Sequence, residues 1–483
     1  MSRIILGLDI GTTSISGVAL DDSGRLLHSV TCQHHAAVSG LPEGYAEQDP
    51  DTLLTTAHEV LRQLAAATVP ADIKAIGLTG QMHSTVLLDG YQAPIGNVIT
   101  WQDKRVMSVV DPRGSATLLD ELLERAPAEA IRNSGCRLAP GYLGSTVFAL
   151  RRLRQWPEHC ASVSFVADWV GSQLTGEPVV TDRSHAASSG LADLAVDRWN
   201  SDLLQAADVN PDWLPKVQPS GRPVGRLTEA MSERTGIPAG TLVGNALGDN
   251  QAAVLSSLPD DPNAVLINIG TGGQIVWRVP EFVRVDGMDT RYLPGSSSRD
   301  DDFQFILVGA GLVGGNSIAW VNSTVRSWLN AFGVDRSEAE IWSVLQQQMQ
   351  GEPDSNGLIC EPYFSGTRPQ PLRRGVFRQV GSKNFTPASV AGSILQGIAQ
   401  VMHDVYVAAS AHRPTPVSRI VMSGNAPRQI PWLVKFVSQR FGVPVDVSPF
   451  TEEAATGAAM LTGVRLGVWK NLADAKGERS SGQ

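Results

Sequence analysis

Two segments of the chain share one pattern of apolar and turn-forming residues. Residues 4–13 read Ile-Ile-Leu-Gly-Leu-Asp-Ile-Gly-Thr-Thr, and residues 264–273 read Ala-Val-Leu-Ile-Asn-Ile-Gly-Thr-Gly-Gly. Each segment has the apolar run of a buried strand and ends in glycine and threonine, and a second strand pattern follows at 16–20 and at 274–277. Two strands around a short glycine turn predict a β-hairpin. Because the two hairpins are about half a chain apart, we expect two homologous domains.

The remaining apolar positions alternate between extended and helical periods. Strands are expected at 74–79, 242–247 and 419–424, and helices at 50–67, 387–410 and 432–441. This alternation is typical of an α/β protein. We place the domain boundary after the strand that ends at Gly248, which predicts domains at 1–248 and 249–475 and a frayed polar tail at 476–483.

Composition and charge narrow the class of protein. The chain has 483 residues, of which 42% are hydrophobic and 18% are charged, as in a folded globular enzyme. Its net charge of −9 argues against a nucleic-acid partner, because binding to a phosphate backbone needs a basic surface. No run approaches the roughly 20 apolar residues that span a bilayer. The four cysteines are far apart, and Asp9 interrupts the first apolar run too early for a signal peptide, so we expect a cytoplasmic protein without zinc or disulfides.

The turns of both hairpins are candidate anion sites. Glycine lets a phosphate approach the backbone N–H groups closely, and threonine adds a hydroxyl donor. One such turn is more often ordinary turn chemistry, whereas two turns placed symmetrically after buried strands favour phosphate binding. Asp9 directly precedes the first turn, where its carboxylate can either hold Mg²⁺ through water or accept hydrogen bonds from the turn amides.

Asp249 and Asn250 follow the apolar strand at 242–247. Open α/β sheets bind their ligands at such strand ends, so the carboxylate is a candidate functional group. The same pair can instead cap a helix over 251–255. The residues alone leave both interpretations open.

Two further segments carry the side chains that a polyhydroxylated ligand needs. Gln81, Met82 and His83 follow the strand at 74–79, and another group comes about twenty residues later, namely Trp101, Asp103 and Arg105. Amide, imidazole, carboxylate and guanidinium groups pair with sugar hydroxyls, and tryptophan covers an apolar face of a sugar. Taken alone, His83 is more often a core histidine, and the acidic and basic residues of the second group form a surface ion pair.

These segments resemble the FGGY family of carbohydrate kinases. The match runs in order from the Asp-x-Gly-Thr-Thr hairpin to Ser423-Gly424-Asn425-Ala426, and includes Asp168, Leu174-Thr175-Gly176, Thr181-Asp182-x-Ser184 and Gly366-Thr367-Arg368. The resemblance implies two actin-like (ribonuclease H-like) α/β domains with a cleft between them. It also implies transfer of the γ-phosphoryl group of ATP, with Mg²⁺, to a hydroxyl of a small sugar. A homodimer is possible on the basis of the resemblance.

The resemblance assigns roles to individual residues. Asp249 matches the catalytic base of the family, and Asp9 is the residue expected to hold Mg²⁺ through water. The implied sugar pocket is Gln81, Met82, His83, Trp101, Asp103, Arg105 and Asn250, and the implied ATP site is Gly11, Thr12, Thr13, Gly270, Thr271, Gly272, Gly315, Gly424 and Asn425. Many family members carry a basic residue where this chain has Ser16, which puts one charge contact near the phosphates in doubt.

The pocket residues also bear on the identity of the sugar. The stretch 80–83, Gly-Gln-Met-His, is similar to ketose kinases, whereas glycerol kinases carry an Arg-Glu pair in place of Met82 and His83. The stretches 100–105 and 141–148 look closer to sedoheptulose kinases than to xylulose kinases. The resemblance therefore favours a heptulose such as sedoheptulose, with xylulose or another pentulose as the alternative. An actin-like nucleotide-dependent switch, or a sugar-binding regulator, is the alternative from another class.

Overall fold

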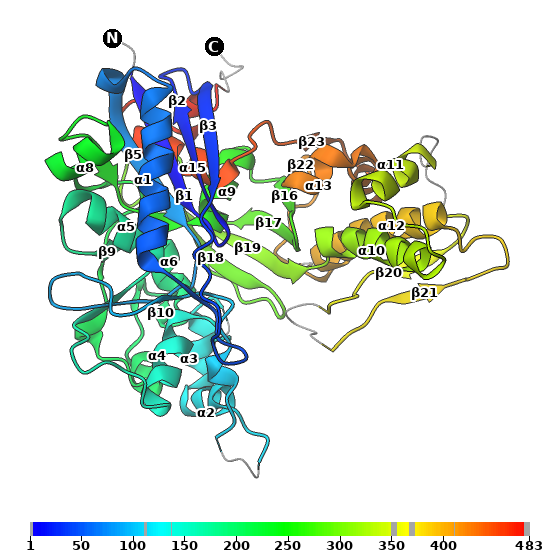
Figure 1. The fold of residues 1–483 in the computed structure, drawn as a ribbon, viewed down its shortest axis with the longest axis horizontal. Helices are drawn as coiled ribbons and strands as arrows, with labels where there is room; N and C mark the ends of the chain where they lie inside the picture. The colour runs from blue at the N-terminus through cyan, green and yellow to red at the C-terminus, as the bar shows by residue number, and fades with distance from the viewer. Residues whose placement is uncertain are drawn as a thin grey trace.

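Two mixed sheets organise the chain in the computed structural model, which describes residues 3–110, 114–136, 138–348, 355–366, 372–409 and 411–477 (Figure 1). The first sheet has the strand order β13-β14-β5-β1-β2-β3, with β15 beside β5, and the second has the order β18-β19-β17-β16-β22-β23. Every strand of the first sheet precedes Asp249, and every strand of the second follows it. Within the described ranges, no helix is long and apolar enough to cross a membrane.

The strands of the first sheet are β1 (Ile4–Ile10), β2 (Ser14–Leu20), β3 (Leu26–Gln33), β5 (Ile73–Gly80), β13 (Pro223–Arg226), β14 (Leu242–Gly244) and β15 (Leu247–Gly248). Those of the second are β16 (Ala264–Ile269), β17 (Gly273–Val279), β18 (Asp289–Pro294), β19 (Phe303–Leu312), β22 (Arg419–Ser423) and β23 (Val445–Val447). The longer helices around the sheets include α1 (Pro50–Ala66), α5 (Val166–Thr175), α9 (Asp249–Ser257), α12 (Pro387–Ala408), α14 (Pro431–Phe441) and α15 (Glu453–Arg465), and α10 (Gly315–Ala331) packs on α12. Shorter helices near the site are α4 (Leu143–Arg152), α6 (Arg183–Ser188) and α13 (Asn425–Gln429).

Both predicted hairpins are present. β1 and β2 pair antiparallel until Ile10 lies opposite Ile15, and β16 and β17 pair antiparallel until Ile269 lies opposite Gly273. Each first strand also pairs in parallel with a later strand, β1 with β5 and β16 with β22. The two sheets therefore repeat one arrangement, which confirms the expected pair of actin-like domains. The boundary between residues 248 and 249 stays a prediction.

The strand expected at 242–247 is interrupted. It is divided into β14 and β15, which both run parallel to β5 but whose pairing with β5 slips by one residue between the two parts. Asn245 lies in this interruption, and its Nδ2 donates to the carbonyl oxygens of Thr181 and Gln218 at 3.1 Å each. These tertiary hydrogen bonds replace the ladder bonds of a continuous strand, as at a β-bulge.

The helices α9 and α15 lie between the two sheets (Figure 1). Their apolar side chains form one buried cluster with residues of β1, β5, β16 and β19. α15 approaches the first sheet closely because two strand positions at the contact are glycine. A Cβ atom at Gly7 would lie 1.9 Å from the carbonyl oxygen of Ala455, and one at Gly77 would lie 2.3 Å from that of Ala458. The C-terminal part of the chain therefore returns to the first sheet and completes its core.

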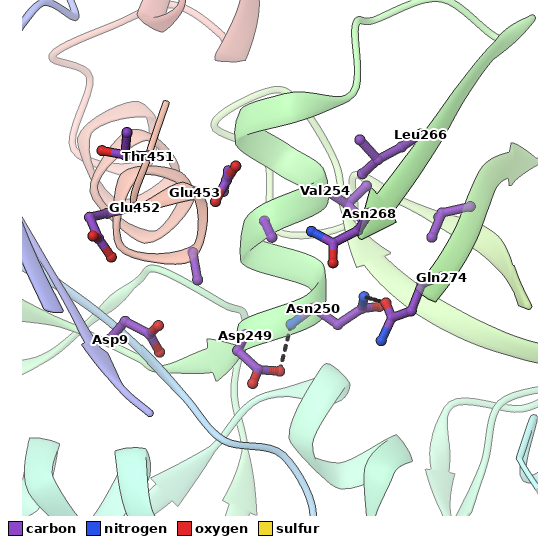
Figure 2. Close-up of a pocket in the computed structure, with 13 residues that line it drawn as sticks. Asp9, Asp249, Asn250, Val254, Leu266, Asn268, Gln274, Thr451, Glu452 and Glu453 are labelled. Atoms are coloured by element: carbon purple, nitrogen blue, oxygen red, sulfur yellow. Dashed lines mark hydrogen bonds between the residues drawn. The ribbon is translucent and has the colours of Figure 1, made fainter. Parts of the chain in front are cut away.

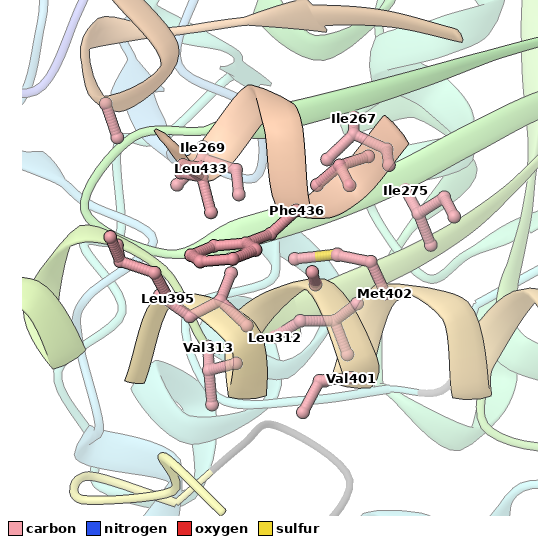
Figure 3. Close-up of a cluster of buried hydrophobic side chains, with 14 of the residues drawn as sticks. Ile267, Ile269, Ile275, Leu312, Val313, Leu395, Val401, Met402, Leu433 and Phe436 are labelled. Carbon is pink, nitrogen blue, oxygen red and sulfur yellow. The ribbon is translucent and has the colours of Figure 1, made fainter. Parts of the chain in front are cut away.

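The second sheet has its main core on the face away from α9. Figure 3 shows Leu433 and Phe436 of α14 packed with Leu395 and Met402 of α12 against Ile269 of β16. The helices α12 and α14 confirm the elements expected at 387–410 and 432–441. Of the residues named in the sequence predictions, Thr367, Arg368, Ser410 and 478–483 lie outside the described ranges.

Candidate active site

Asp9 and Asp249 face each other across a cavity of about 270 Å³. Asp9 lies near the end of β1, and Asp249 begins α9 directly after β15. Because β1 and β15 both run parallel to β5, the two carboxylates reach the same edge of the first sheet. The second hairpin and the start of α15 complete the wall, so that both domains line the cavity. Figure 2 shows the other polar side chains that line it: Asn250, Asn268, Gln274, Thr451, Glu452 and Glu453.

The carboxyl group of Asp9 has a strongly altered acidity. Burial, followed by the nearby charges of Asp249 and Glu452, raises the pKa of Asp9 to about 8. Its Oδ1 atom is buried and has no hydrogen-bond partner among the residues that the structure describes, so the turn amides do not satisfy it. An unpaired carboxylate oxygen beside two further acids is the setting in which a divalent cation is attracted. This setting is compatible with one contact from Asp9 to a hydrated Mg²⁺ ion, and the described residues include no group of three or more His, Cys, Asp or Glu side chains that could hold the ion by themselves.

Asp249 does not cap the helix that it begins. The N-cap of α9 is Gly248, which makes no side-chain capping bond, and the Asp249 carboxylate accepts a hydrogen bond from the backbone N of Asn250 at 2.6 Å. Burial raises the pKa of Asp249, while that hydrogen bond and the positive charges of His185 and Arg291 act in the opposite direction. A carboxylate in this position can accept a proton from a group in the cavity.

A buried polar network lies beneath Asp249, and sequence reasoning gave it no role. Ser184 Oγ accepts a hydrogen bond from the backbone N of Gly248 at 2.8 Å and donates to Asp182 at 2.8 Å. The next residue, His185, is fully buried with its Nδ1 atom 3.3 Å from Oδ1 of Asp168. These bonds fix the backbone immediately before Asp249. The family resemblance had matched the acidic and serine positions, but only the tertiary structure connects them to Asp249.

The turn of the first hairpin, a predicted phosphate site, is hydrogen-bonded to residues of the predicted sugar pocket. Gln48 Nε2 donates to the carbonyl oxygen of Thr12 at 2.6 Å, and Gln81 Nε2 donates to Gln48 Oε1 at 2.8 Å. Trp101 Nε1 donates to Thr12 Oγ1 at 2.9 Å, while 42% of the tryptophan surface stays exposed. The turn at Gly11–Thr13 and the polar residues Gln81 and Trp101 therefore form one connected assembly on the first domain.

The predicted nucleotide residues of the second domain meet where three loops converge. The backbone N of Gly315 donates to the carbonyl oxygen of Gly270 at 2.9 Å, and that of Asn316 donates to Thr271 at 2.9 Å. A Cβ atom at Gly424 would lie 2.5 Å from the carbonyl oxygen of Ile269, so the loop before α13 also needs glycine to approach. Asn425 follows as the exposed first residue of α13, and Gly272 is exposed in the turn of the second hairpin.

A larger pocket of about 530 Å³ continues from these loops along α10. It is lined by Asn316 and Trp320 of that helix, by Arg374, and by Phe364, whose ring stacks on Trp320 with centroids 4.1 Å apart. Aromatic faces beside a candidate phosphate-binding turn suit a nucleobase.

Met82 and His83 line a third and much narrower cavity of about 10 Å³. His83 has a left-handed backbone conformation, with φ of 71°, its Nδ1 donates to the carbonyl oxygen of Ser188 at 2.7 Å, and its ring stacks on Tyr142 with centroids 4.0 Å apart. The wall continues with Gln251 of α9 and Arg291 of β18, so both domains contribute. These last two residues and Tyr142 were missed as site residues, because their approach to the pocket depends on tertiary packing.

Asp103 and Arg105 form a buried ion pair rather than the surface pair considered from the sequence. Arg105 Nε donates to Asp103 Oδ1 at 2.8 Å, and its Nη2 donates to Glu47 Oε1 at 2.6 Å. The guanidinium also lies over the ring of Tyr45, 4.3 Å from its centroid. Asp103 in addition accepts from the backbone N of Ala46 at 2.9 Å. The pair holds together the segments that carry Gln48 and Trp101.

Replacing Arg105 by methionine is expected to destabilise the protein by about 3–5 kcal/mol, because two carboxylates would be left without their buried cation. Urea denaturation of the variant and the wild type measures this loss. Arg62→Met is the matched control, since its ion pair with Glu59 is exposed on α1 and solvent screening leaves such pairs with little effect on stability. Equal losses in the two variants would contradict the structural role of Arg105.

The chain matches two family models over most of its length. Residues 4–256 match the model described as "FGGY family of carbohydrate kinases, N-terminal domain", and residues 265–466 match the corresponding C-terminal domain.

Individual relatives differ in the substrate that they are named for. The glycerol kinase of Gloeobacter violaceus is 28% identical over 98% of this chain and 90% of its own length. The sedoheptulokinase of Homo sapiens is 27% identical over 95% of this chain and 97% of its own length. The crystal structure of xylulose kinase from Rhodospirillum rubrum has the same fold, with a TM-score of 0.83 at 24% identity over 98% of this chain and 92% of that one. The protein belongs to the FGGY family of carbohydrate kinases, enzymes that transfer a phosphoryl group to an alcohol group of a small substrate.

Proposed function

We propose that this kinase transfers the γ-phosphoryl group of MgATP to the terminal hydroxyl of an open-chain ketose, with Asp249 as the base. The observation that carries the proposal is the position of the first turn of α9. Asp249 and Asn250 line the cavity together with Asp9 of β1 and with Asn268 and Gln274 of the second hairpin, and the next residue, Gln251, lines the narrow cavity beside Met82 and His83. A substrate hydroxyl held at this turn would therefore lie between the proposed nucleotide site and the proposed sugar pocket.

In the proposed reaction Asp249 accepts the proton of the attacking hydroxyl. Phosphoryl transfer has a loose transition state, so the nucleophile needs positioning more than prior ionisation, and an ordinary carboxylate is an adequate base. The backbone N–H groups of the turns at Gly11–Thr13 and Gly270–Gly272 would stabilise charge on the phosphoryl oxygens. Asn250 is fixed for a positioning role, since its Nδ2 donates to Gln274 Oε1 at 2.6 Å and its Oδ1 accepts from Arg291 at 3.2 Å.

Asp9 is the residue proposed to hold Mg²⁺ through water. When bound with ATP, Mg²⁺ would supply neutralisation of the charge that develops during transfer. The Asp9 carboxylate would keep the water shell of the ion at the edge of the first sheet, and its interaction with the cation would favour the ionised form of Asp9.

The sugar is proposed to be a heptulose such as sedoheptulose, with D-xylulose or another pentulose as the alternative. The similarity of residues 100–105 and 141–148 to sedoheptulose kinases supports the longer sugar, and the human sedoheptulokinase aligns along 97% of its length. The glycerol kinase of Gloeobacter violaceus is as similar to this chain overall as the human sedoheptulokinase is. The proposed choice of sugar therefore rests on the pocket residues.

The test is ADP release across a set of polyols at one ATP concentration. Sedoheptulose and mannoheptulose represent heptuloses, fructose a hexulose, and xylulose and ribulose pentuloses. The proposal expects the highest kcat/KM for a heptulose. A pentulose with a kcat/KM well above both heptuloses would favour the alternative, and turnover of none of the ketoses would contradict the proposed function.

Sugar binding is expected to close the two domains, because the two phosphate turns lie on different domains and both must reach one ATP molecule. Closure also keeps water away from the phosphoryl group. Small-angle scattering should therefore show a smaller radius of gyration with a ketose, with or without a non-hydrolysable ATP analogue, than for the free enzyme. The control is the radius of gyration measured with the ATP analogue but without the ketose. An unchanged radius in every liganded state would count against a closing cleft.

A further inference from the structure

We infer that Gln251 is a sugar-binding residue, whose side-chain amide pairs with hydroxyl groups of the substrate. The inference rests on the proposed function, because it deepens the assignment of the same pocket to a polyol. Neither the family resemblance nor the sequence pattern had given this residue a role.

The first observation is an unsatisfied amide. Gln251 is 0% exposed, and neither its Oε1 nor its Nε2 atom has a hydrogen-bond partner among the residues that the structure describes. Buried polar atoms in native proteins are paired in the large majority of cases, and an unpaired one is destabilising. The neighbouring Asn250 shows the contrast, since both ends of its amide are engaged with Gln274 and Arg291. A fully buried amide without any internal partner indicates a missing ligand.

The second observation is where this amide lies. Gln251 is the third residue of α9 and lines the narrow cavity together with Met82, His83 and Arg291. Its Oε1 is packed against the backbone before Asp249, because a Cβ atom at Gly248 would lie 2.8 Å from it. The amide is therefore two residues from the proposed base and beside the residues that the family resemblance assigns to the sugar.

The size of the cavity explains why the amide is unpaired. A volume of about 10 Å³ has room for about one water molecule and not for a sugar. Its wall comes from both domains, since Arg291 belongs to β18 of the second sheet and Met82 and His83 follow β5 of the first. Separation of the domains would open the cavity, and a bound polyol would then occupy the space when they close.

The chemistry of the amide selects the ligand class. A glutamine side chain offers one acceptor oxygen and two donor hydrogens, and each sugar hydroxyl can both donate and accept. Two hydroxyls of one ketose chain can therefore satisfy both ends of Gln251. Arg291 is already engaged with Asp289 at 2.8 Å and with Asn250, so its charge is balanced within the protein, and a neutral polyol fits better than an anionic sugar.

The test is Gln251→Met, which keeps the length and volume of the side chain but removes the amide. The sugar is whichever polyol the wild type phosphorylates fastest, so failure of the heptulose assignment does not affect the outcome. The KM for that sugar should rise about ten- to a hundredfold, as expected for lost hydrogen bonds in a buried site, while the KM for ATP stays near its wild-type value. The melting temperature without ligand should be unchanged or higher, because no internal hydrogen bond is lost.

Thr462→Val is the matched control. Thr462 Oγ1 is also buried and without a partner in the described part of the chain, but it lies on α15, away from both cavities. This variant should leave both KM values unchanged. Gln251→Asn, which shortens the side chain by one methylene, should also raise the sugar KM and serves if the methionine variant does not fold.

A wild-type sugar KM in Gln251→Met would overturn the inference. With an unchanged melting temperature, that result would indicate an amide that binds only water, and with a lowered melting temperature it would indicate an amide with a purely structural role. An inactive wild type on every polyol would instead contradict the proposed function.

Discussion

Replacing Asp249 by asparagine is expected to lower kcat by about 10²–10⁴, the usual loss when a general base is removed. The neutral amide cannot accept the hydroxyl proton. The fold should be retained, because Gly248 rather than Asp249 is the N-cap of α9, and the asparagine oxygen can still accept the hydrogen bond from the backbone N of Asn250. The proposed nucleotide contacts lie on other loops, so the ATP dissociation constant should change little.

Turnover, ATP dissociation constant and melting temperature are to be measured on one preparation of the variant. Asp51→Asn is the matched control, since Asp51 is an exposed acid in the first turn of another helix, α1. Because burial raises the pKa of Asp249, the wild-type kcat/KM should fall as the pH is lowered through a value above that of an ordinary aspartate. A folded Asp249→Asn enzyme with near wild-type turnover would remove this carboxylate from the mechanism.

Glycerol is expected to be a nearly inert substrate, with a kcat/KM about 10⁴–10⁵ below that of the best ketose, although relatives named glycerol kinase are 28% identical to this chain. Met82 offers no strong hydrogen-bonding group where glycerol kinases carry a charged pair. The Nδ1 atom of His83 already donates to the carbonyl oxygen of Ser188, and its ring is held by Tyr142. Glycerol offers fewer hydroxyl groups to the pocket than a ketose does, and sites built to hydrogen-bond a substrate discriminate strongly against one that lacks the group.

The measurement is the steady-state kcat/KM for glycerol and for each ketose at saturating ATP. The KM for ATP, determined with each acceptor, is the control that the nucleotide site is equally occupied. Glycerol turnover within tenfold of the best ketose would contradict the assignment of Met82 and His83 to a ketose pocket.

Local signals predicted the scaffold of this protein well. Both hairpins were visible as apolar runs ended by glycine and threonine, and the structure brings the loops at Gly270, Gly315 and Gly424 together as the family resemblance implied. The resemblance assigned Gly424 and Gly270, which are more than 150 residues apart, to one ATP site, which periodicity alone does not give.

The features that depend on burial were harder to predict from the sequence. The strand at 242–247 looks continuous in sequence, and its break at Asn245 follows from bonds to Thr181 and Gln218. The sequence suggested that Asp103 and Arg105 form a surface ion pair. Glu47 and Tyr45, which enclose the pair, come from a segment more than fifty residues earlier, so the burial of the pair could not be predicted from its neighbours in sequence. Nothing in the sequence distinguishes Gln251, fully buried and unpaired, from the many glutamines that face solvent.

The return of α15 to the first sheet has a consequence for how the chain can be divided. A fragment ending near residue 248 would contain every strand of the first sheet but would lack the helix whose backbone carbonyls lie against Gly7 and Gly77. The inner face of β1 and β5 would then be an exposed apolar surface. The unit that carries the proposed sugar pocket is therefore discontinuous along the chain. A ribosome must complete nearly the whole polypeptide before the first sheet can bury that face.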